Sequence, residues 1–394
     1  MGSEAKKAAN PATIAAQALG RIDERTGAIS PAVHMSSTFQ RDADNLYRAG
    51  YSYARAENPA YDQPEAVLAR LEDGVAAMLF ASGMAAATAV FQALSPGDHV
   101  VAPKVMYWSL RGWILGFAAQ WGLAVDIVDM TDLDRLKHAM RPGRTKLVWA
   151  ETPGNPMWDI VDIAAAAQIA HAAGARLAVD STVATPVLTQ PIALGADVVM
   201  HSCTKYLNGH SDLVAGALVT AREDEFWNRL KGVRTQQGGI LGSFEAWLLL
   251  RGMRTLYPRV RAANASARIL AERLAQNPAI ARVLYPGLAD FPGHAIAARQ
   301  MQGGFGAMLS IRLRGGEPAA IATAANVRLW KRATSLGGVE SLIEHRASVE
   351  GPDTPCPRDL LRLSVGIEDT DDLVADLEEA LKSAGDQRNI SCTS

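Results

Sequence analysis

Between residues 65 and 220, short apolar runs alternate with longer stretches of helical composition. The runs are almost continuously apolar, which is typical of strands buried on both faces rather than of a half-exposed strand. Stretches such as GMAAATAVFQAL (83–94) and IAAAAQIAHAAG (163–174) separate them. We therefore predict a mostly parallel sheet covered by helices on both faces. Its predicted strands are at 75–81, 99–103, 146–151, 176–180 and 197–202.

The pattern changes on both sides of this region. Residues 1–60 are rich in Pro, Ser, Tyr and Arg and show little periodicity, as expected of an arm that lies over another surface. Residues 244–276 are helical in pattern, 306–315 and 360–369 indicate strands, and 371–384 indicate an amphipathic helix. We predict an α/β protein with an arm (1–60), an α/β domain (61–245) and a smaller α+β C-terminal domain (246–394).

Composition narrows the class of ligand. The 394 residues are 48% apolar and 20% charged, with a formal net charge of −2, so we expect small-molecule ligands and neither nucleic acid nor an anionic membrane. The sequence has no hydrophobic signal-peptide core and no apolar run of about 18 residues, so we expect neither secretion nor a membrane span. Cys203, Cys356 and Cys392 form no disulfide or zinc pattern, which favours a cytoplasmic protein.

Polar residues follow the predicted strands where ligands gather in parallel sheets, beyond the carboxyl ends. Ser82 and Gly83 come between a strand and a helix, a position that can bind phosphate, although Ser82 taken alone is better explained as a helix N-cap. Asp180 ends another strand, and taken alone it is better explained as a solvated turn carboxylate or a helix cap. Asn155, within ETPGNP, can be an Asx-turn residue or a ligand contact.

Lys205 in HSCTKYLNGH (201–210) is the hardest of these residues to explain by structure alone. It follows a strand that is predicted to be buried, and Ser202 and Thr204 beside it can bind phosphate. A lysine amine in such a place can form a Schiff base with a carbonyl compound. Pyridoxal 5'-phosphate (PLP) has an aldehyde for Lys205, a phosphate for the hydroxyl groups and a pyridine nitrogen for Asp180.

Other chemistries receive little support. The sequence has no P-loop motif, no strand-linked G-x-G-x-x-G and no H-E-x-x-H. The eight histidines form no ligand-spaced cluster, so we predict no metal site. The segment ASGMA lacks the complete G-x-S-x-G of a serine hydrolase.

Residues 178–212 resemble the PLP site of the Cys/Met metabolism enzymes, which include cystathionine γ-synthases, cystathionine γ-lyases and methionine γ-lyases. The likeness continues in order through TGAISPAVHMSSTF (26–39), YSYARAENP (51–59), ASGMAA (81–86), ETPGNP (151–156), SLGGVESLIEH (335–345) and LLRLSVGIED (360–369). It implies the fold type I of PLP-dependent transferases, which is like that of aspartate aminotransferase.

The resemblance also implies roles for individual residues. Lys205 would hold PLP and shuttle protons, Asp180 would pair with the ring nitrogen, and Tyr107 would stack on the ring and act as acid or base. Arg362, with Ser335 and Thr334 nearby, would bind the substrate. The remaining cofactor contacts would come from Ser82, Gly83, Met84, Asn155, Thr182, Ser202 and Thr204, and from Tyr53 and Arg55 of a neighbouring subunit in a homotetramer.

The activity implied is γ-elimination or γ-replacement on a sulfur-containing or other γ-substituted L-amino acid, such as an O-linked homoserine analogue. Substrate choice stays open because the chain departs from the family at Trp108, Ser109, Thr334 and Arg346. Two alternatives are β-elimination from cystathionine, as in a cystathionine β-lyase, and a non-catalytic PLP-binding homologue.

Overall fold

The computed structural model describes residues 9–351 and 354–391, with side chains to residue 384. Cys392 lies outside the described residues. A large sheet has the strand order β1-β7-β6-β5-β4-β2-β3, in which β7 alone runs antiparallel to its neighbours. Its strands are β1 (Ala76–Phe80), β2 (His99–Pro103), β3 (Ala124–Val128), β4 (Thr145–Glu151), β5 (Arg176–Asp180), β6 (Val198–Ser202) and β7 (Gly216–Thr220).

The large sheet is buried on both faces, which explains its continuously apolar strands. Along β4, Leu147 and Trp149 pack into one hydrophobic cluster, while Val148 and Ala150 pack into another on the opposite face. Successive side chains of a strand point to opposite faces, so each face needs its own apolar set. The prediction of a mostly parallel α/β sheet is confirmed, whereas β3 and β7 were not predicted.

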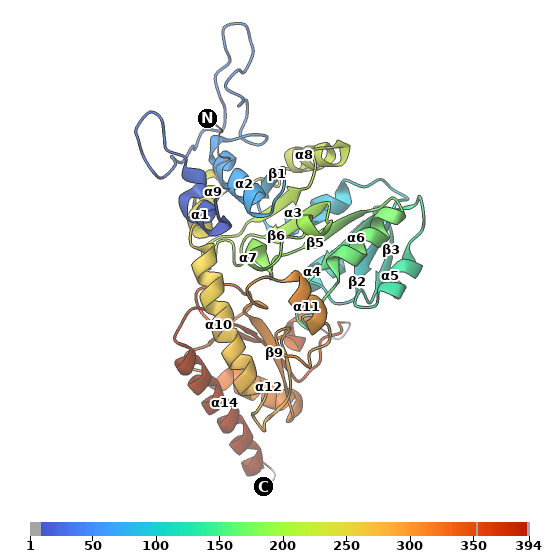
Figure 1. Ribbon diagram of the computed structural model, residues 1–394, viewed down its shortest axis with the longest axis vertical. Helices are drawn as coiled ribbons and strands as arrows, with labels where there is room; N and C mark the ends of the chain where they lie inside the picture. The colour runs from blue at the N-terminus through green and yellow to red at the C-terminus, as the bar shows by residue number, and fades with distance from the viewer. Residues whose placement is uncertain (1–8, 352–353, 392–394) are drawn as a thin grey trace, which may run out of the picture.

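Helices cover the two faces of the large sheet and link it to the rest of the molecule (Figure 1). Helices α3 and α8 pack together on one face, while α2 and α6 contact strands from the other. The helices up to residue 253 are α1 (Pro11–Gln17), η1 (Ala18–Gly20), α2 (Pro59–Leu71), α3 (Gly83–Gln92), α4 (Trp108–Trp113), η2 (Ile114–Ala118), α5 (Leu133–Ala139), α6 (Ile163–Ala172), α7 (Thr185–Leu188), η3 (Ile192–Leu194), α8 (Glu225–Gln237) and α9 (Ser243–Met253).

A second sheet of five strands follows, with the order β10-β11-β12-β9-β8. All its pairs are antiparallel except β10 with β11. The long helix α10 (Leu256–Leu274) runs from the large sheet to this smaller one (Figure 1). The other elements are β8 (Ile280–Leu284), α11 (His294–Gln300), β9 (Met308–Leu313), α12 (Gly316–Asn326), β10 (Lys331–Arg332), β11 (Leu342–His345), α13 (Ala347–Glu350), β12 (Leu360–Ser364) and α14 (Thr370–Ser391).

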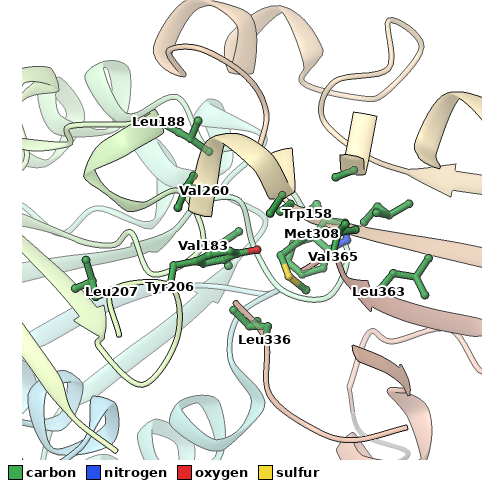
Figure 2. Packing of buried hydrophobic residues seen from close by; sticks show 14 of the residues in the cluster. Trp158, Val183, Leu188, Tyr206, Leu207, Val260, Met308, Leu336, Leu363 and Val365 are labelled. Atoms are coloured by element: carbon green, nitrogen blue, oxygen red, sulfur yellow. The ribbon is translucent and has the colours of Figure 1, made fainter. Parts of the chain in front are cut away.

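The two sheets share one hydrophobic core. Figure 2 shows Val183 and Tyr206 from the large-sheet region close to Met308 and Val365 from the small-sheet region. Trp158 is fully buried at this junction and donates from Nε1 to Ser310 Oγ at 2.9 Å. This packing fixes the distance between the two sheets. It therefore also fixes the distance between side chains of one sheet and the side chains of the other sheet that face them.

Residues 9–60 contain few regular elements. After α1 and η1 they form extended loops that project from the large-sheet region (Figure 1). Met35 is 76% exposed, and the backbone bridge between Thr38 and Tyr53 ties two of the loops together. An extended segment with exposed apolar side chains fits the predicted arm, but its contact with a neighbouring subunit stays a prediction. The division at residue 245 also stays a prediction, and that residue lies inside α9.

Candidate active site

Three neighbouring parallel strands place their last residues side by side. Glu151 ends β4, Asp180 ends β5 and Ser202 ends β6, and Glu151 is the register partner of Asp180. Lys205 lies in the 203–215 connection between β6 and β7. Because β4, β5 and β6 run in the same direction, the polar groups at their carboxyl ends meet at one edge of the sheet.

These strand ends open onto a cavity of about 680 Å³ between the two sheets. Most of the predicted site residues line it. They are Ser82, Gly83, Met84, Tyr107, Asn155, Asp180, Thr182, Ser202, Thr204, Lys205, Thr334, Ser335 and Arg362. Tyr53 and Arg55 are not among the lining residues; they lie in the N-terminal loops, where the Arg55 guanidinium stacks over the Tyr53 ring. Their predicted role needs a second subunit and stays a prediction.

The N-terminus of α3 forms one end of the cavity. Ser82 caps this helix, since its Oγ accepts a hydrogen bond from Ala85 N at 3.0 Å. The backbone N–H groups of Gly83 and Met84 belong to the first turn, where no partner within the helix is available. A Cβ on Gly83 would lie 2.8 Å from Ser202 Cβ, so only glycine lets the helix start approach β6 this closely. Such a helix start can bind a phosphate group.

Thr182 and Thr204 hold the backbone around this end in place. Thr182 donates from its backbone N to Asp180 Oδ1 at 3.0 Å, and its Oγ1 accepts from Ser202 N at 2.8 Å. Thr204 Oγ1 exchanges two hydrogen bonds with the backbone of Ala215, at 3.1 and 3.2 Å. The two threonines therefore link the ends of β5 and β6 to the start of β7.

Two buried carboxyl groups lie at the sheet edge. Burial raises the pKa of Asp180, although hydrogen bonds from Thr182 and the nearby His201 act in the opposite direction. Burial, followed by the charge of Asp180, raises the pKa of Glu151 to about 8. Glu151 accepts hydrogen bonds from Tyr107 N at 2.7 Å and Asn155 N at 3.0 Å, so it also positions two predicted site residues.

Glu151 was not singled out from the sequence, yet it lines the cavity. Its position as the last residue of a predicted strand was the signal that could have identified it. Trp108, Arg346 and Val349 also line the cavity, and the first two were noted only as departures from the family.

The amine of Lys205 lies between the two sheets. Its Nζ donates to Ser335 Oγ at 2.7 Å. Burial, and then the positive charge of Arg362, lowers the pKa of Lys205 to about 8, while Glu344 acts in the opposite direction. A larger fraction of the amine is therefore neutral near pH 7 than for an ordinary lysine, and only the neutral amine is a nucleophile.

Arg362 reaches the cavity from β12 of the small sheet. Its Nη1 donates to Asn155 Oδ1 at 3.1 Å, and its Nη2 donates to Ser335 O at 2.8 Å and to Glu344 Oε2 at 2.6 Å. The side chain is 5% exposed. A planar guanidinium held by its neighbours can bind a carboxylate through two parallel hydrogen bonds.

The residues of the cavity fit PLP. A lysine with a lowered pKa can react with an aldehyde, a buried carboxylate can pair with a protonated ring nitrogen, and the start of α3 can bind a phosphate. The structure brings these three features into one cavity large enough for a cofactor and a small substrate.

Comparisons with known proteins agree with this chemistry. Residues 12–382 match the family described as Cys/Met metabolism PLP-dependent enzyme. The chain belongs to this family. It is therefore a PLP-dependent enzyme, and the predictions of family, fold class and cofactor are confirmed.

Relatives within the Cys/Met metabolism family match nearly the whole chain. The chain is 46% identical to a cystathionine gamma-synthase of Mycobacterium tuberculosis over 94% of this chain and 96% of the relative. It is 40% identical to a cystathionine gamma-lyase of Bacillus subtilis, over 92% and 96%. A cystathionine gamma synthase from Xanthomonas oryzae pv. oryzae, solved in complex with cystathionine, superposes with a TM-score of 0.91 at 39% identity, covering 96% and 99%.

The sequence analysis also considered cysteine chemistry, metal sites and membrane spans. Cys203 is fully buried, and burial raises its pKa. Burial raises the pKa of Cys356 to about 12. Within 9–351 and 354–391, no three potential ligand side chains gather as a metal cluster. Over the same ranges, no helix has the length and apolar character needed to cross a bilayer.

Proposed function

We propose that this enzyme catalyses γ-elimination or γ-replacement on a γ-substituted L-amino acid, with a sulfur-containing or O-linked substituent. The observation that carries the proposal is that the Lys205 amine, the buried carboxyl group of Asp180 and the guanidinium of Arg362 line one cavity, in which the charge of Arg362 lowers the pKa of Lys205. The named relatives are cystathionine γ-synthases and γ-lyases, which supports γ-chemistry over β-elimination.

PLP, when bound, withdraws electrons from the α-carbon of the substrate and so makes its hydrogen acidic. Lys205 would bind the cofactor and, once displaced by the substrate amino group, move protons at the α- and β-carbons. Asp180 would keep the ring nitrogen protonated, since a buried carboxylate stabilises a neighbouring cation. Tyr107 would stack on the ring and give a proton to the leaving group.

The remaining predicted residues would hold the two ligands. Asn155 and Thr182 would contact the ring, and Arg362 would bind the substrate α-carboxylate with help from Ser335 and Thr334. The phosphate would be held by Ser82, Gly83, Met84, Ser202 and Thr204. Tyr53 and Arg55 would complete the site of a neighbouring subunit, which makes a cytoplasmic homotetramer with shared sites part of the proposal.

Spectroscopy and product analysis test the proposal together. The purified protein should be yellow with bound PLP, and Lys205→Ala should abolish both the covalent link and turnover. Lys137→Ala, which changes an exposed lysine on α5, should alter neither. A panel of cystathionine, methionine and O-acyl homoserines should yield 2-oxobutyrate, or, when a thiol such as L-cysteine is added to replace the γ-substituent, a homoserine-derived amino acid. Pyruvate as the main product would instead indicate β-elimination, and a yellow protein without turnover would indicate a non-catalytic homologue.

A further inference from the structure

A second arginine lies beside Arg362 at the substrate end of the cavity. Arg346 precedes α13, lines the cavity and has a side chain only 2% exposed. A buried guanidinium is costly unless anionic groups compensate its charge. The partners of Arg346 therefore decide what its charge does in the cavity.

Two carboxylates hold Arg346. Its Nε and Nη2 donate to Glu350 Oε1 at 3.0 and 2.8 Å, and its Nη1 donates to Glu344 Oε2 at 2.8 Å. The same Glu344 oxygen accepts the 2.6 Å hydrogen bond from Arg362 Nη2. Glu344 is thus shared between the two guanidinium groups, whereas Glu350 bonds to Arg346.

This sharing matters because Glu344 competes with any anion that approaches Arg362. The cluster of Arg346, Arg362, Glu344 and Glu350 is neutral in formal charge. A carboxylate that bonds to one cation neutralises it more completely than one divided between two. The division of Glu344 therefore leaves part of the charge of Arg362 available at the cavity surface.

We propose that Arg346 is a positioning residue that shares Glu344 with Arg362, so that Glu344 neutralises Arg362 only in part and Arg362 stays able to bind the α-carboxylate of the substrate. This inference rests on the proposed function, because it needs Arg362 to be the carboxylate-binding group. Arg346 acts through Glu344 and need not touch the substrate.

Binding of two matched probes to the PLP-loaded enzyme tests the inference. L-norleucine has no leaving group on its γ-carbon, so its affinity can be measured by calorimetry without elimination. L-norleucinamide replaces the carboxylate by a neutral amide of the same shape. The wild type should bind L-norleucine more tightly, and the ratio of the two dissociation constants reports the contribution of the carboxylate alone.

Two variants should change this ratio in opposite directions. Arg346→Met combined with Glu350→Gln keeps the net charge but leaves Glu344 paired with Arg362 alone, so the affinity for L-norleucine should fall about tenfold. Glu350→Gln alone keeps an acceptor for Arg346 and removes a negative charge, so that affinity should rise about threefold. In both variants the affinity for L-norleucinamide should stay within about twofold of the wild type.

Arg346→Pro, again combined with Glu350→Gln so that no buried carboxylate is left unpaired, checks the result with a second replacement. The φ of Arg346 is −67°, which proline adopts without strain. The substitution therefore removes the guanidinium with a side chain that differs in shape from methionine. It should also weaken L-norleucine selectively. Equal losses for both probes, or unchanged affinity for L-norleucine in either double variant, would overturn the inference.

The proposed function can fail separately. A wild type that is yellow and turns over a γ-substituted amino acid, but binds both probes equally, overturns the role of Arg346 and leaves the reaction standing. A wild type that binds no PLP overturns both.

Discussion

The two walls of the cavity both contain buried charged groups, but they hold them differently. On the large-sheet wall, Asp180 and Glu151 are bonded by backbone N–H groups, and burial raises the pKa of both. On the small-sheet wall, Arg362 and Arg346 form ion pairs with carboxylates. A ligand that brings positive charge therefore stabilises the large-sheet wall, whereas the guanidinium groups of the small-sheet wall already have carboxylate partners.

This difference matches the two ligands of the proposed reaction. A cofactor that stays bound can supply the cation that stabilises the Asp180 carboxylate. The large-sheet wall therefore does not need a cationic side chain next to Asp180. A substrate that comes and goes needs a partner that is stable in its absence, and the ion pairs of Arg362 provide this. Four predictions test the contrast, from the largest expected effect to the smallest.

Replacing Asp180 by Asn should have the largest effect. The amide keeps the shape and the hydrogen bond from Thr182 N, but it removes the negative charge that would stabilise the protonated ring nitrogen. We expect kcat to fall by about 10²- to 10³-fold. Steady-state kinetics at full cofactor occupancy, checked by absorbance, measures this. A kcat within tenfold of the wild type at full occupancy would contradict the role of the charge.

Replacing Arg362 by Lys should mainly weaken substrate binding. Lysine keeps the positive charge but not the planar pair of donors, so we expect kcat/KM to fall by about 10- to 100-fold, chiefly through KM. Arg312→Lys on the neighbouring strand β9 is the matched control, because Arg312 pairs with Asp359 and does not line the cavity. A similar loss in both variants would point to damage of the small sheet instead.

Replacing Glu151 by Gln should flatten the dependence of stability on pH. The folded-state pKa of about 8 lies above the ordinary value of 4.5, so the folded protein binds the proton more tightly than the unfolded chain. Glu151 therefore lowers the free energy of unfolding as pH rises from about 4.5 to about 8.

Thermal melts at pH 5 and pH 8 measure this effect. The decrease in Tm over that range should be smaller in Glu151→Gln than in the wild type by about 2 °C or more. The variant is expected to melt lower at pH 5, because a side-chain amide cannot accept from both Tyr107 N and Asn155 N. Parallel decreases in the two proteins would mean that Glu151 is not protonated in the fold.

Replacing Ser335 by Ala should have the smallest effect. The substitution removes the hydroxyl that accepts from Lys205 Nζ at 2.7 Å, but the Ser335 carbonyl still accepts from Arg362. A single hydrogen bond of this kind changes kcat/KM by about threefold to tenfold. The pH profile of kcat/KM is the measurement. A loss above about 100-fold would place Ser335 among the essential groups and weaken the contrast between the walls.

Much of the large-sheet wall could be predicted from the sequence. Parallel strands have apolar runs, and the first polar residues mark their ends. This local signal made Asp180, Ser202 and Lys205 candidates, and all three line the cavity. Glu151 carries the same signal, although it was not among the predicted site residues. Strand β7 was not predicted, because an antiparallel strand after a short connection breaks the strand–helix rhythm that located the others.

The small-sheet wall was much harder to predict. Arg362 and Ser335 were named only through resemblance to a family, and Arg346 was known only as an unusual residue. Nothing in the spacing indicates that Glu344 is shared, because its two arginine partners lie at positions 346 and 362 on different elements. That arrangement depends on the pairing of β11 with β12, which local pattern does not encode.

The sequence by itself determined the α/β class, the strand ends and the lysine chemistry, because apolar periodicity and residue type are local properties of the chain. The tertiary structure alone decided how far the Lys205 amine lies from Arg362 and which carboxylates balance the arginines. Both depend on how the two sheets pack around Trp158. There, residues separated by about 150 positions in sequence are in direct contact.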